Sequence, residues 1–469
     1  MRLSSLIAAS ALLLSSHISV AGELTPYQAE ARAMFAEAIG YRTARGHGQV
    51  PAFASSLVKK LKAAGFSDDD IQLIRIDADG EPTAALVVRY KGDGSSGKKA
   101  LGLMAHMDVV DALPKDWVKN PFELIEEDGT FYGRGTIDNK HGVVLLTSTF
   151  LRLKREGFVP SRDMVLLFTG DEETGMVTTR YLAKTMPEKM NLGFILNSDA
   201  GGGSLNEKNE AVMYMLQAAE KTFVTFEMTV KNPGGHSSRP RKDNAIYELA
   251  TALGKLSAYE FPFQSNELTT SYFAAMGKQI GGKDGAVMQA FAADPSNKEA
   301  AALLRQNPAL VGTLGTTCVA TMLAGGHAEN ALPQSATATV NCRVFPGMGM
   351  DEVKSRLKTA VDNDSVEFEQ IAEATVSPVS EIPDDIRAAV TRQIHKRYPG
   401  LKIIPYMESG GTDGMHFRLA GVPTVASSGI LIQQKDMFAH GLNERVPVDQ
   451  FYSALDYWYE VLKDLAGSD

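Results

Sequence analysis

The residues best suited to chemistry are acids and histidines that follow strand-like apolar segments. The clearest case is the apolar run at 165–168, which leads through Thr169-Gly170 into the consecutive carboxylates of Asp171, Glu172 and Glu173. Adjacent buried carboxylates raise one another's pKa, and a buried charge without a partner is costly. Such a cluster therefore needs a cation, although a solvated acidic turn after an edge strand would have the same composition.

Other segments deliver similar side chains into turns. A strand at 101–106 ends in His106 and Asp108, and Asp138, Asp199 and His440 each lie beside a glycine-containing turn. Side chains two residues apart in an extended segment point the same way, so Asp108 could orient His106. Taken singly, a structural His–Asp pair and a helix N-cap at Asp138 are the simpler interpretations.

Together these residues make a donor set for a pair of divalent metal ions. Two imidazoles with several carboxylates suit zinc first, and two ions ~3.5–4 Å apart form a recognised hydrolytic centre. Of the adjacent acids, one can bind metal while the other takes a proton from an activated water. The chain has no Gly-x-Ser-x-Gly elbow, no His-Glu-x-x-His helix and no phosphate-binding loop.

The bulk composition is that of an acidic globular protein. The chain has 469 residues and a formal net charge of −9, with no basic run, which argues against a nucleic-acid partner. Residues 1–21 combine Arg2, a short apolar core and the small-x-small sequence Ser19-Val20-Ala21, which predicts a secretory signal cleaved near Ala21. An N-terminal helix of the fold is the alternative. We expect an exported protein, periplasmic or secreted, without a membrane span.

The elements that must position these residues alternate between strands and helices. This order predicts an α/β fold with a central, mostly parallel sheet and helices on both faces. The expected strands include 71–76, 84–90, 101–106, 193–197 and 422–426, and the expected helices include 25–40, 51–64, 143–153, 178–186, 384–397 and 447–466.

The pattern changes at 222–230, which alternates as a half-exposed antiparallel strand does. We therefore expect an inserted α+β lid and dimerisation domain at 221–344, between two parts of a discontinuous catalytic domain at 22–220 and 345–469. Inside the insert we expect a helix at 244–256, strands at 317–323 and 336–344, and an irregular Ala/Gly-rich stretch from about 260 to 316.

A series of motifs runs through the chain in a fixed order. They are His106-Met-Asp108, Gly133-Arg-Gly-x-x-Asp138-Asn-Lys, Gly170-Asp-Glu172-Glu173-Thr-Gly, Ser198-Asp199, Gly235-His236-Ser, Asn330-x-x-Pro333, Arg343, Gly410-Gly-Thr and Ala439-His440-Gly. Taken in order, these motifs resemble the dizinc amidohydrolase and peptidase family that includes glutamate carboxypeptidase, aminoacylase-1, acetylornithine deacetylase, carnosinase and succinyl-diaminopimelate desuccinylase. The similarity spans nearly the whole chain after residue 21, and it is strongest to the carboxypeptidase S and carnosinase-like branch. Asp199 stands where glutamate carboxypeptidases and desuccinylases carry Glu, which disfavours succinyl or acetylornithine substrates.

The resemblance implies two zinc ions per subunit, with cobalt or manganese as possible substitutes. Asp138 would bridge the ions and would be joined to Asn139 by a cis peptide bond. The remaining ligands would be His106 and Asp199 on one ion and Glu173 and His440 on the other.

The resemblance also implies roles for the other residues. Glu172 would be the general base and Asp108 would hold His106. His236 would stabilise the oxyanion, from the same chain or from the partner subunit of a homodimer formed through the lid. The residues expected to hold the substrate's carboxylate or backbone are Asn330, Arg343, Gly410, Gly411 and Thr412.

The expected activity is hydrolysis of an amide bond next to a free carboxylate, in dipeptides or short peptides. An N-acyl amino acid amidohydrolase is the alternative, and a non-catalytic peptide-binding module is a more distant one.

The two cysteines, Cys318 and Cys342, lie on strands placed symmetrically about Asn330. If those strands pair in that register, the thiols face each other, and export would permit a disulfide. Two buried free thiols are the alternative.

Overall fold

The structure is a computed structural model, and it describes residues 23–371 and 373–467. The predicted signal at 1–21 lies outside the described residues. Within those ranges, no helix combines the length and apolar character that crossing a membrane requires.

The larger sheet places the predicted site along one edge. Strands β6, β3, β7 and β17 are neighbours and run parallel, so their carboxyl ends meet on the same side. Strands β3 and β6 are buried throughout, as expected for parallel strands covered on both faces. In the described part of the chain the sheet has the order β1-β2-β6-β3-β7-β17-β9-β8-β18, and β16 pairs with β9. The strands are β1 (Ile71–Ala78), β2 (Glu81–Tyr90), β3 (Ala100–His106), β6 (Met164–Thr169), β7 (Leu192–Asn197), β8 (Gly202–Leu205), β9 (Ala211–Glu220), β16 (Ile403–Glu408), β17 (Thr424–Ala426) and β18 (Leu431–Gln433).

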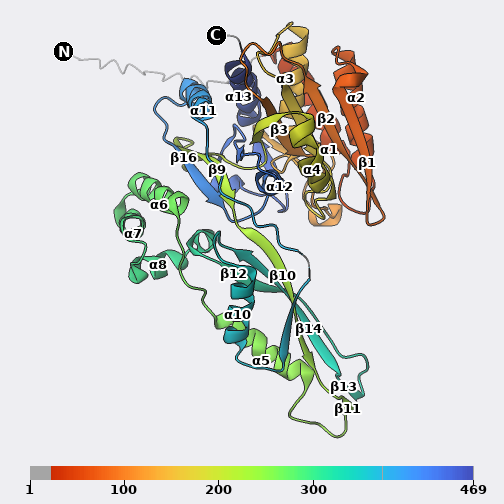
Figure 1. Cartoon of the computed structure of the whole chain (residues 1–469), viewed down its shortest axis with the longest axis vertical. Helices are drawn as coiled ribbons and strands as arrows, with labels where there is room; N and C mark the ends of the chain where they lie inside the picture. Colours follow the sequence, from red (N-terminus) through yellow and green to blue (C-terminus); the bar gives the residue numbers. More distant parts are fainter. Residues whose placement is uncertain (1–22, 372, 468–469) are drawn as a thin grey trace, which may run out of the picture.

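Helices cover both faces of this sheet, which confirms the predicted fold class (Figure 1). Phe35 of α1 and Phe451 of α13 stack with ring centroids 4.6 Å apart, so these two helices pack together on one face. One layer contains α1 (Pro26–Gly40), α2 (Val50–Ala63), α3 (Lys140–Arg155), α11 (Asp384–Arg397) and α13 (Val448–Ala466), and the other contains α4 (Val177–Lys189) and α12 (Gly414–Leu419).

A second, antiparallel sheet forms a separate unit that projects from the first (Figure 1). Its strand order is β12 (Thr317–Gly325), β14 (Ser335–Val344), β10 (Thr222–Lys231) and β15 (Val366–Gln370). Helices α5 (Ala245–Ala258) and α10 (Met350–Val361) pack on one face, and the side chains of β10 alternate between buried and exposed as predicted. At its distal tip, β11 (Gly235–His236) pairs with β13 (Ala331–Leu332).

The second sheet extends past the expected domain end at residue 344. Strand β15 pairs with β10, with Phe368 opposite Met228, and Val353 and Leu357 of α10 belong to the same apolar core. Pairing over a long sequence separation is not visible in local periodicity. We propose that the second unit ends near residue 371 and that the catalytic domain resumes after it.

The stretch from about 260 to 316 is helical, and the expectation of an irregular segment is wrong. Its helices are α6 (Glu267–Ile280), α7 (Gly282–Ala293), α8 (Lys298–Arg305) and α9 (Pro308–Val311). Asn266 and Asn297 cap α6 and α8, and Gly281 separates α6 from α7 at a φ of +64°. Gly281 is therefore a break between two helices, Gly277 and Gly285 lie inside them, and the alanines favour helix.

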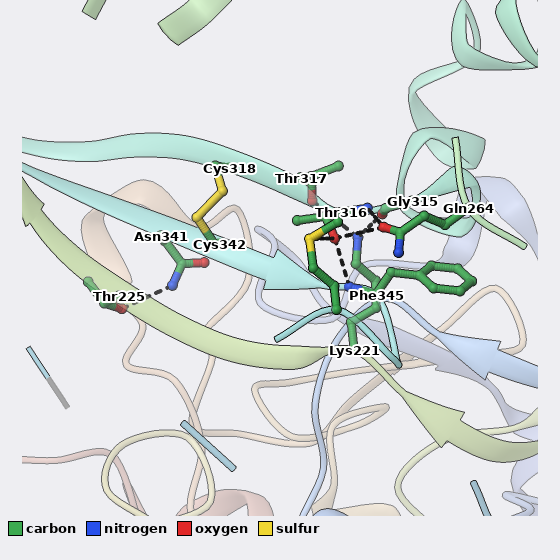
Figure 2. The surroundings of a disulfide bond; sticks show 11 residues. Lys221, Thr225, Gln264, Gly315, Thr316, Thr317, Cys318, Asn341, Cys342 and Phe345 are labelled. Atoms are coloured by element: carbon green, nitrogen blue, oxygen red, sulfur yellow. Dashed lines mark hydrogen bonds between the residues drawn. A yellow bond between two sulfur atoms is a disulfide. The ribbon is translucent and has the colours of Figure 1, made fainter. Parts of the chain in front are cut away.

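The two cysteines form a disulfide, which confirms the hypothesis drawn from their placement. Cys318 and Cys342 are directly opposite across β12 and β14, and their sulfurs are bonded. Figure 2 shows this bond near Lys221, which joins β9 to β10. The Lys221 Nζ donates to the carbonyl oxygens of Gly312 and Gly315 at 3.1 and 2.8 Å, so the start of β12 is fixed at the junction of the two sheets.

Candidate active site

The predicted metal ligands converge at the carboxyl edge of the larger sheet. His106 ends β3, Asp138 precedes α3, and Asp199 follows β7. The Nε2 atom of His106 lies 2.9 Å from Asp138 Oδ1 and 3.2 Å from Asp199 Oδ1. These side chains form one half of the cluster.

The other half lies on the opposite oxygen of Asp138. His440 Nε2 is 3.1 Å from Asp138 Oδ2 and 3.0 Å from the Glu173 carboxylate. The two oxygens of Asp138 therefore face different histidines. The donor atoms of His106, Asp138 and Glu173 all lie within 4.8 Å of one another, which is compact enough for a metal site.

The electrostatics show that this cluster needs positive charge. Burial raises the pKa values of Glu173 and Asp199, and the neighbouring Asp138 raises both further. Burial lowers the pKa of His106, but the surrounding carboxylates outweigh it and raise that pKa well above its usual value. Asp138 and Glu173 raise the pKa of His440 to about 10. Imidazoles and carboxylates in this proportion fit a pair of borderline divalent ions.

A short loop presents Asp138 to both histidines. The Asp138–Asn139 peptide bond is cis, as the resemblance implied. Asn139 Nδ2 donates to Asp199 Oδ1 at 2.6 Å, and the backbone N–H of Asp138 donates to Glu444 Oε1 at 3.1 Å. Hydrogen bonds on both sides of the bond thus orient the central carboxylate.

The three consecutive acids after β6 separate into different environments. Asp171 caps α4, accepting from the backbone N–H groups of Val177 and Thr178 at 2.6 and 2.9 Å. Glu173 faces His440, as described above. Glu172 has no hydrogen bond or ion pair to its carboxylate from any residue that the structure describes.

The surroundings of Glu172 raise the pKa of its carboxyl group. Burial raises its pKa well above the usual value, and the carboxylates of Asp199 and Asp413 raise it further against the effect of His106. A buried carboxyl group with a raised pKa and no competing hydrogen bond is suited to taking up and passing on a proton.

Asp108 lies beside this turn, and its contact with His106 is different from the expected one. His106 Nδ1 is 3.0 Å from the backbone carbonyl oxygen of Asp108 but 3.6 Å from its carboxylate. The carboxylate instead accepts the backbone N–H groups of Glu172 and Glu173 at 3.1 and 3.0 Å.

The expected substrate-binding residues divide into two groups. Arg343 lies on β14, with its guanidinium 4.7 Å from the centre of the Phe223 ring. Burial lowers its pKa, and Glu172 is close enough to act against that effect, which places Arg343 near the cluster. No acid among the described residues lies within ion-pair distance of it. A Cβ added to Gly411 would lie 3.8 Å from Arg343 Nη1, so the turn at 410–412 faces this guanidinium. Thr412 is buried, and its N–H donates to Glu220 at 2.5 Å.

Asn330 forms the second group, and it lies beside His236, the expected oxyanion residue, away from the ligand cluster of the same chain. Both are exposed at the tip of the second sheet, where the N–H of Ser237 donates to the carbonyl oxygen of Asn330 at 3.1 Å. Figure 1 shows this tip, marked by β11 and β13, at the end of the second sheet that points away from the larger sheet. One chain alone therefore does not bring His236 to Glu172.

Two supporting residues carried no sequence-based assignment, Arg134 and Glu444. They form a buried ion pair at 2.6 Å beside Asp138. Arg134 belongs to the Gly133-Arg-Gly motif, and each of the two residues lies four positions from a predicted ligand in a turn.

A parallel α/β sheet that gathers two histidines and several carboxylates at its carboxyl edge defines a metal-dependent hydrolase. The chain belongs to the peptidase family M20/M25/M40, whose profile matches residues 102–464.

Its curated relatives include more than one activity. The chain is 28% identical over 376 residues to the N-fatty-acyl-amino acid synthase/hydrolase PM20D1 of Homo sapiens, covering 77% of this chain and 73% of that protein. It is 26% identical over 391 residues to carboxypeptidase S-like 2 of Dictyostelium discoideum, covering 81% and 74%.

Solved structures share the fold. The di-peptidase Dug1p of Saccharomyces cerevisiae superposes with a TM-score of 0.70 at 16% identity, covering 94% of this chain and 97% of that one. The M20 family metallo-carboxypeptidase Sso-CP2 of Sulfolobus solfataricus superposes with a TM-score of 0.68 at 19% identity, covering 92% and 98%.

Proposed function

We propose that this chain is a dizinc peptidase that hydrolyses the amide bond of dipeptides or short peptides with a free carboxylate. One observation carries the proposal: the two oxygens of Asp138 face His106 and His440 separately. A carboxylate in this position is suited to bridging two ions. When bound, the ions supply Lewis acidity, which acidifies a water and polarises the amide carbonyl.

The ligand assignment follows the two halves of the cluster. His106, Asp138 and Asp199 hold one ion, and Asp138, Glu173 and His440 hold the other. Zinc is the proposed metal because imidazole and carboxylate donors suit it, and cobalt or manganese could replace it.

Glu172 is the proposed general base. Its carboxylate has no competing hydrogen bond in the described chain, and its backbone is held by Asp108. It takes a proton from the attacking water and passes it to the leaving nitrogen.

Arg343 and the turn at Gly410 and Gly411 hold the substrate's carboxylate, while Thr412, buried with its N–H bound to Glu220, keeps the turn in place rather than contacting substrate as expected. Support comes from the lack of an ion-pair partner for Arg343 among the described residues and from its position against Gly411. A guanidinium binds a carboxylate through two parallel hydrogen bonds.

His236 acts in the site of a second subunit, where it stabilises the oxyanion, and Asn330 accompanies it. Both lie at the exposed tip, away from the ligand cluster of their own chain, which supports a role in the site of another copy. Strand β12 offers a dimer contact, because it is an edge strand with Val319, Met322 and Leu323 exposed by 61%, 69% and 70%. We therefore include a homodimer formed through the second unit.

Export is also part of the proposal, with a signal removed near Ala21. The Cys318–Cys342 disulfide supports it, because disulfides persist mainly in oxidising compartments.

N-acyl amino acid hydrolysis is the second candidate, and the similarity to PM20D1 of Homo sapiens favours it. Both substrates present a carboxylate to Arg343 and differ on the other side of the amide bond.

The test uses purified protein loaded with zinc, a dipeptide panel and a long-chain N-acyl amino acid, with and without chelator. We expect two zinc ions per chain and chelator-sensitive cleavage, and the preferred substrate separates the two candidates. If no substrate is cleaved in a chelator-sensitive way, the proposal is wrong. An intact protein that holds no zinc would favour a binding module.

A further inference from the structure

A buried ion pair connects the two loops that carry Asp138 and His440. Arg134 Nη1 lies 2.6 Å from Glu444 Oε2, and the side chains of the two residues are 3% and 0% exposed. The loops meet where β5 (Thr130–Tyr132) pairs with β19 (Arg445–Pro447).

The second oxygen of Glu444 organises the loop of Asp138. It accepts the backbone N–H groups of Gly135, Ile137 and Asp138 at 3.1, 2.8 and 3.1 Å. One of these bonds is to the central carboxylate residue itself. A shift of Glu444 would therefore move Asp138 directly.

Arg134 reaches the other loop. Its Nη2 donates to the backbone carbonyl oxygen of His440 at 3.2 Å. His440 has a φ of +63°, a left-handed conformation that is disfavoured for a residue with a side chain. The bond from Arg134 helps to hold this conformation, which aims the imidazole at Asp138.

A purely structural pair is the alternative explanation. Buried ion pairs are a weak source of stability, because desolvation offsets their attraction, and apolar replacements are often as stable. Stability therefore does not explain why both members contact segments that carry ligands. A role in holding the ligand geometry of the proposed metal centre explains these contacts.

We propose that Arg134 and Glu444 are positioning residues that hold Asp138 and His440 in ligand geometry before any metal binds. This inference rests on the proposed function, because it assigns the pair to the same metal centre. Outer residues that orient ligands typically change metal affinity about 10–100-fold when they are replaced.

Two variants test the pair in different ways. Glu444→Gln preserves size, but its amide can turn an N–H toward Arg134, which is also a donor. Arg134→Lys keeps the charge and loses the planar fork that reaches His440. The matched control is Asp436→Asn, which breaks the neighbouring pair of Asp436 with Arg445, formed at 2.9 Å.

The first measurement is zinc affinity by competition with a chromophoric chelator. We expect Glu444→Gln to weaken binding about 10–100-fold. Arg134→Lys should weaken the binding of one zinc ion more than that of the other, because the contact it loses is with the loop that carries His440. Asp436→Asn should bind zinc as the wild type does.

The second measurement uses metal-free protein, so it does not depend on activity. Amide hydrogen exchange in a peptide covering 134–140 should be faster in Glu444→Gln than in the wild type or the control. If Glu444→Gln fails to fold, Arg134→Lys decides the question by zinc affinity.

The outcomes separate this inference from the function. Folded variants that bind two zinc ions with wild-type affinity would overturn the positioning role and leave the proposed function intact. A wild-type protein that binds no zinc would overturn both.

Discussion

The carboxylate of Asp108 accepts the backbone N–H groups of Glu172 and Glu173 at 3.1 and 3.0 Å. One side chain thus fixes the backbone of both the proposed base and its neighbouring metal ligand. The carbonyl oxygen of the same residue lies 3.0 Å from His106 Nδ1. Asp108 therefore connects the ends of β3 and β6, and its carboxylate acts mainly on the acidic turn.

The first prediction concerns Asp108→Asn. An amide can accept only one of the two N–H groups, so the turn should shift and kcat should fall about 10–100-fold. The measurement is kcat together with zinc content. Asp111→Asn, in the same loop but paired with Arg42 at the surface, should retain wild-type kcat. Equal effects from both variants would remove the special role of Asp108.

The second prediction is that Glu172→Gln retains both zinc ions but lowers kcat by ~10²–10⁴ or more, because general base catalysis is lost. Amide and carboxylate have nearly the same size, so the site keeps its shape. Zinc analysis and steady-state kinetics on the best substrate check this. Near-normal turnover would exclude Glu172 as the base.

Much of the fold and the cluster of expected metal ligands could be predicted from local patterns. Apolar strands that end in His106 or in the acids at 171–173 indicated a common sheet edge, because parallel strands present their carboxyl ends together. The structure brings all five expected ligands to that edge.

The missed features depend on long-range contacts. Glu444 lies 306 residues from Asp138, and nothing near it in sequence indicates that its carboxylate accepts three N–H groups of that loop. The pairing of β15 with β10 likewise joins segments that lie far apart in the sequence, so no local pattern indicates it. The helices at 260–316 are obscured for another reason, because the glycines around Gly281 favour turns while the alanines near them favour helix.

The third prediction concerns His236 and uses complementation. His236→Ala and Glu172→Gln should each be nearly inactive. If His236 serves the partner's site, a mixed dimer of the two variants contains one intact site. Random exchange should then restore up to about a quarter of wild-type activity.

The measurement is activity after unfolding and refolding the two variants together, with each refolded alone as the control. No recovery in mixed dimers would show that His236 does not act across the interface. Loss of zinc from His236→Ala would mean that its role lies elsewhere.

The fourth prediction concerns Cys318 and Cys342. Unfolded, unreduced protein should show no reactive thiol, and reduction should expose two per chain. Because the bond closes a loop over a separation of 24 residues, replacing both cysteines with serine should lower the free energy of unfolding of the second unit by about 3 kcal/mol. Urea unfolding measures this, and two reactive thiols before reduction would contradict the bond.

The fifth prediction is a pH dependence set by Lys221 at the junction of the sheets. Burial lowers its pKa to about 7, and Arg343 adds to this effect. Between about pH 7 and pH 10 the unfolded chain keeps a proton that the folded chain has released, so this residue makes the free energy of unfolding rise with pH. Below about pH 7 both states are protonated and its contribution is constant.

Lys221→Met should remove this contribution to the rise of the free energy of unfolding with pH. Lys278→Met, on the exposed surface of α6, should leave that pH dependence unchanged. Urea unfolding of the three proteins between pH 6 and pH 10 measures the difference, and other titrating groups cancel in the comparison. An identical slope in the wild type and Lys221→Met would mean that Lys221 keeps its proton when folded. Its hydrogen bonds to Gly312 and Gly315 would then stabilise the charged ammonium rather than the neutral amine.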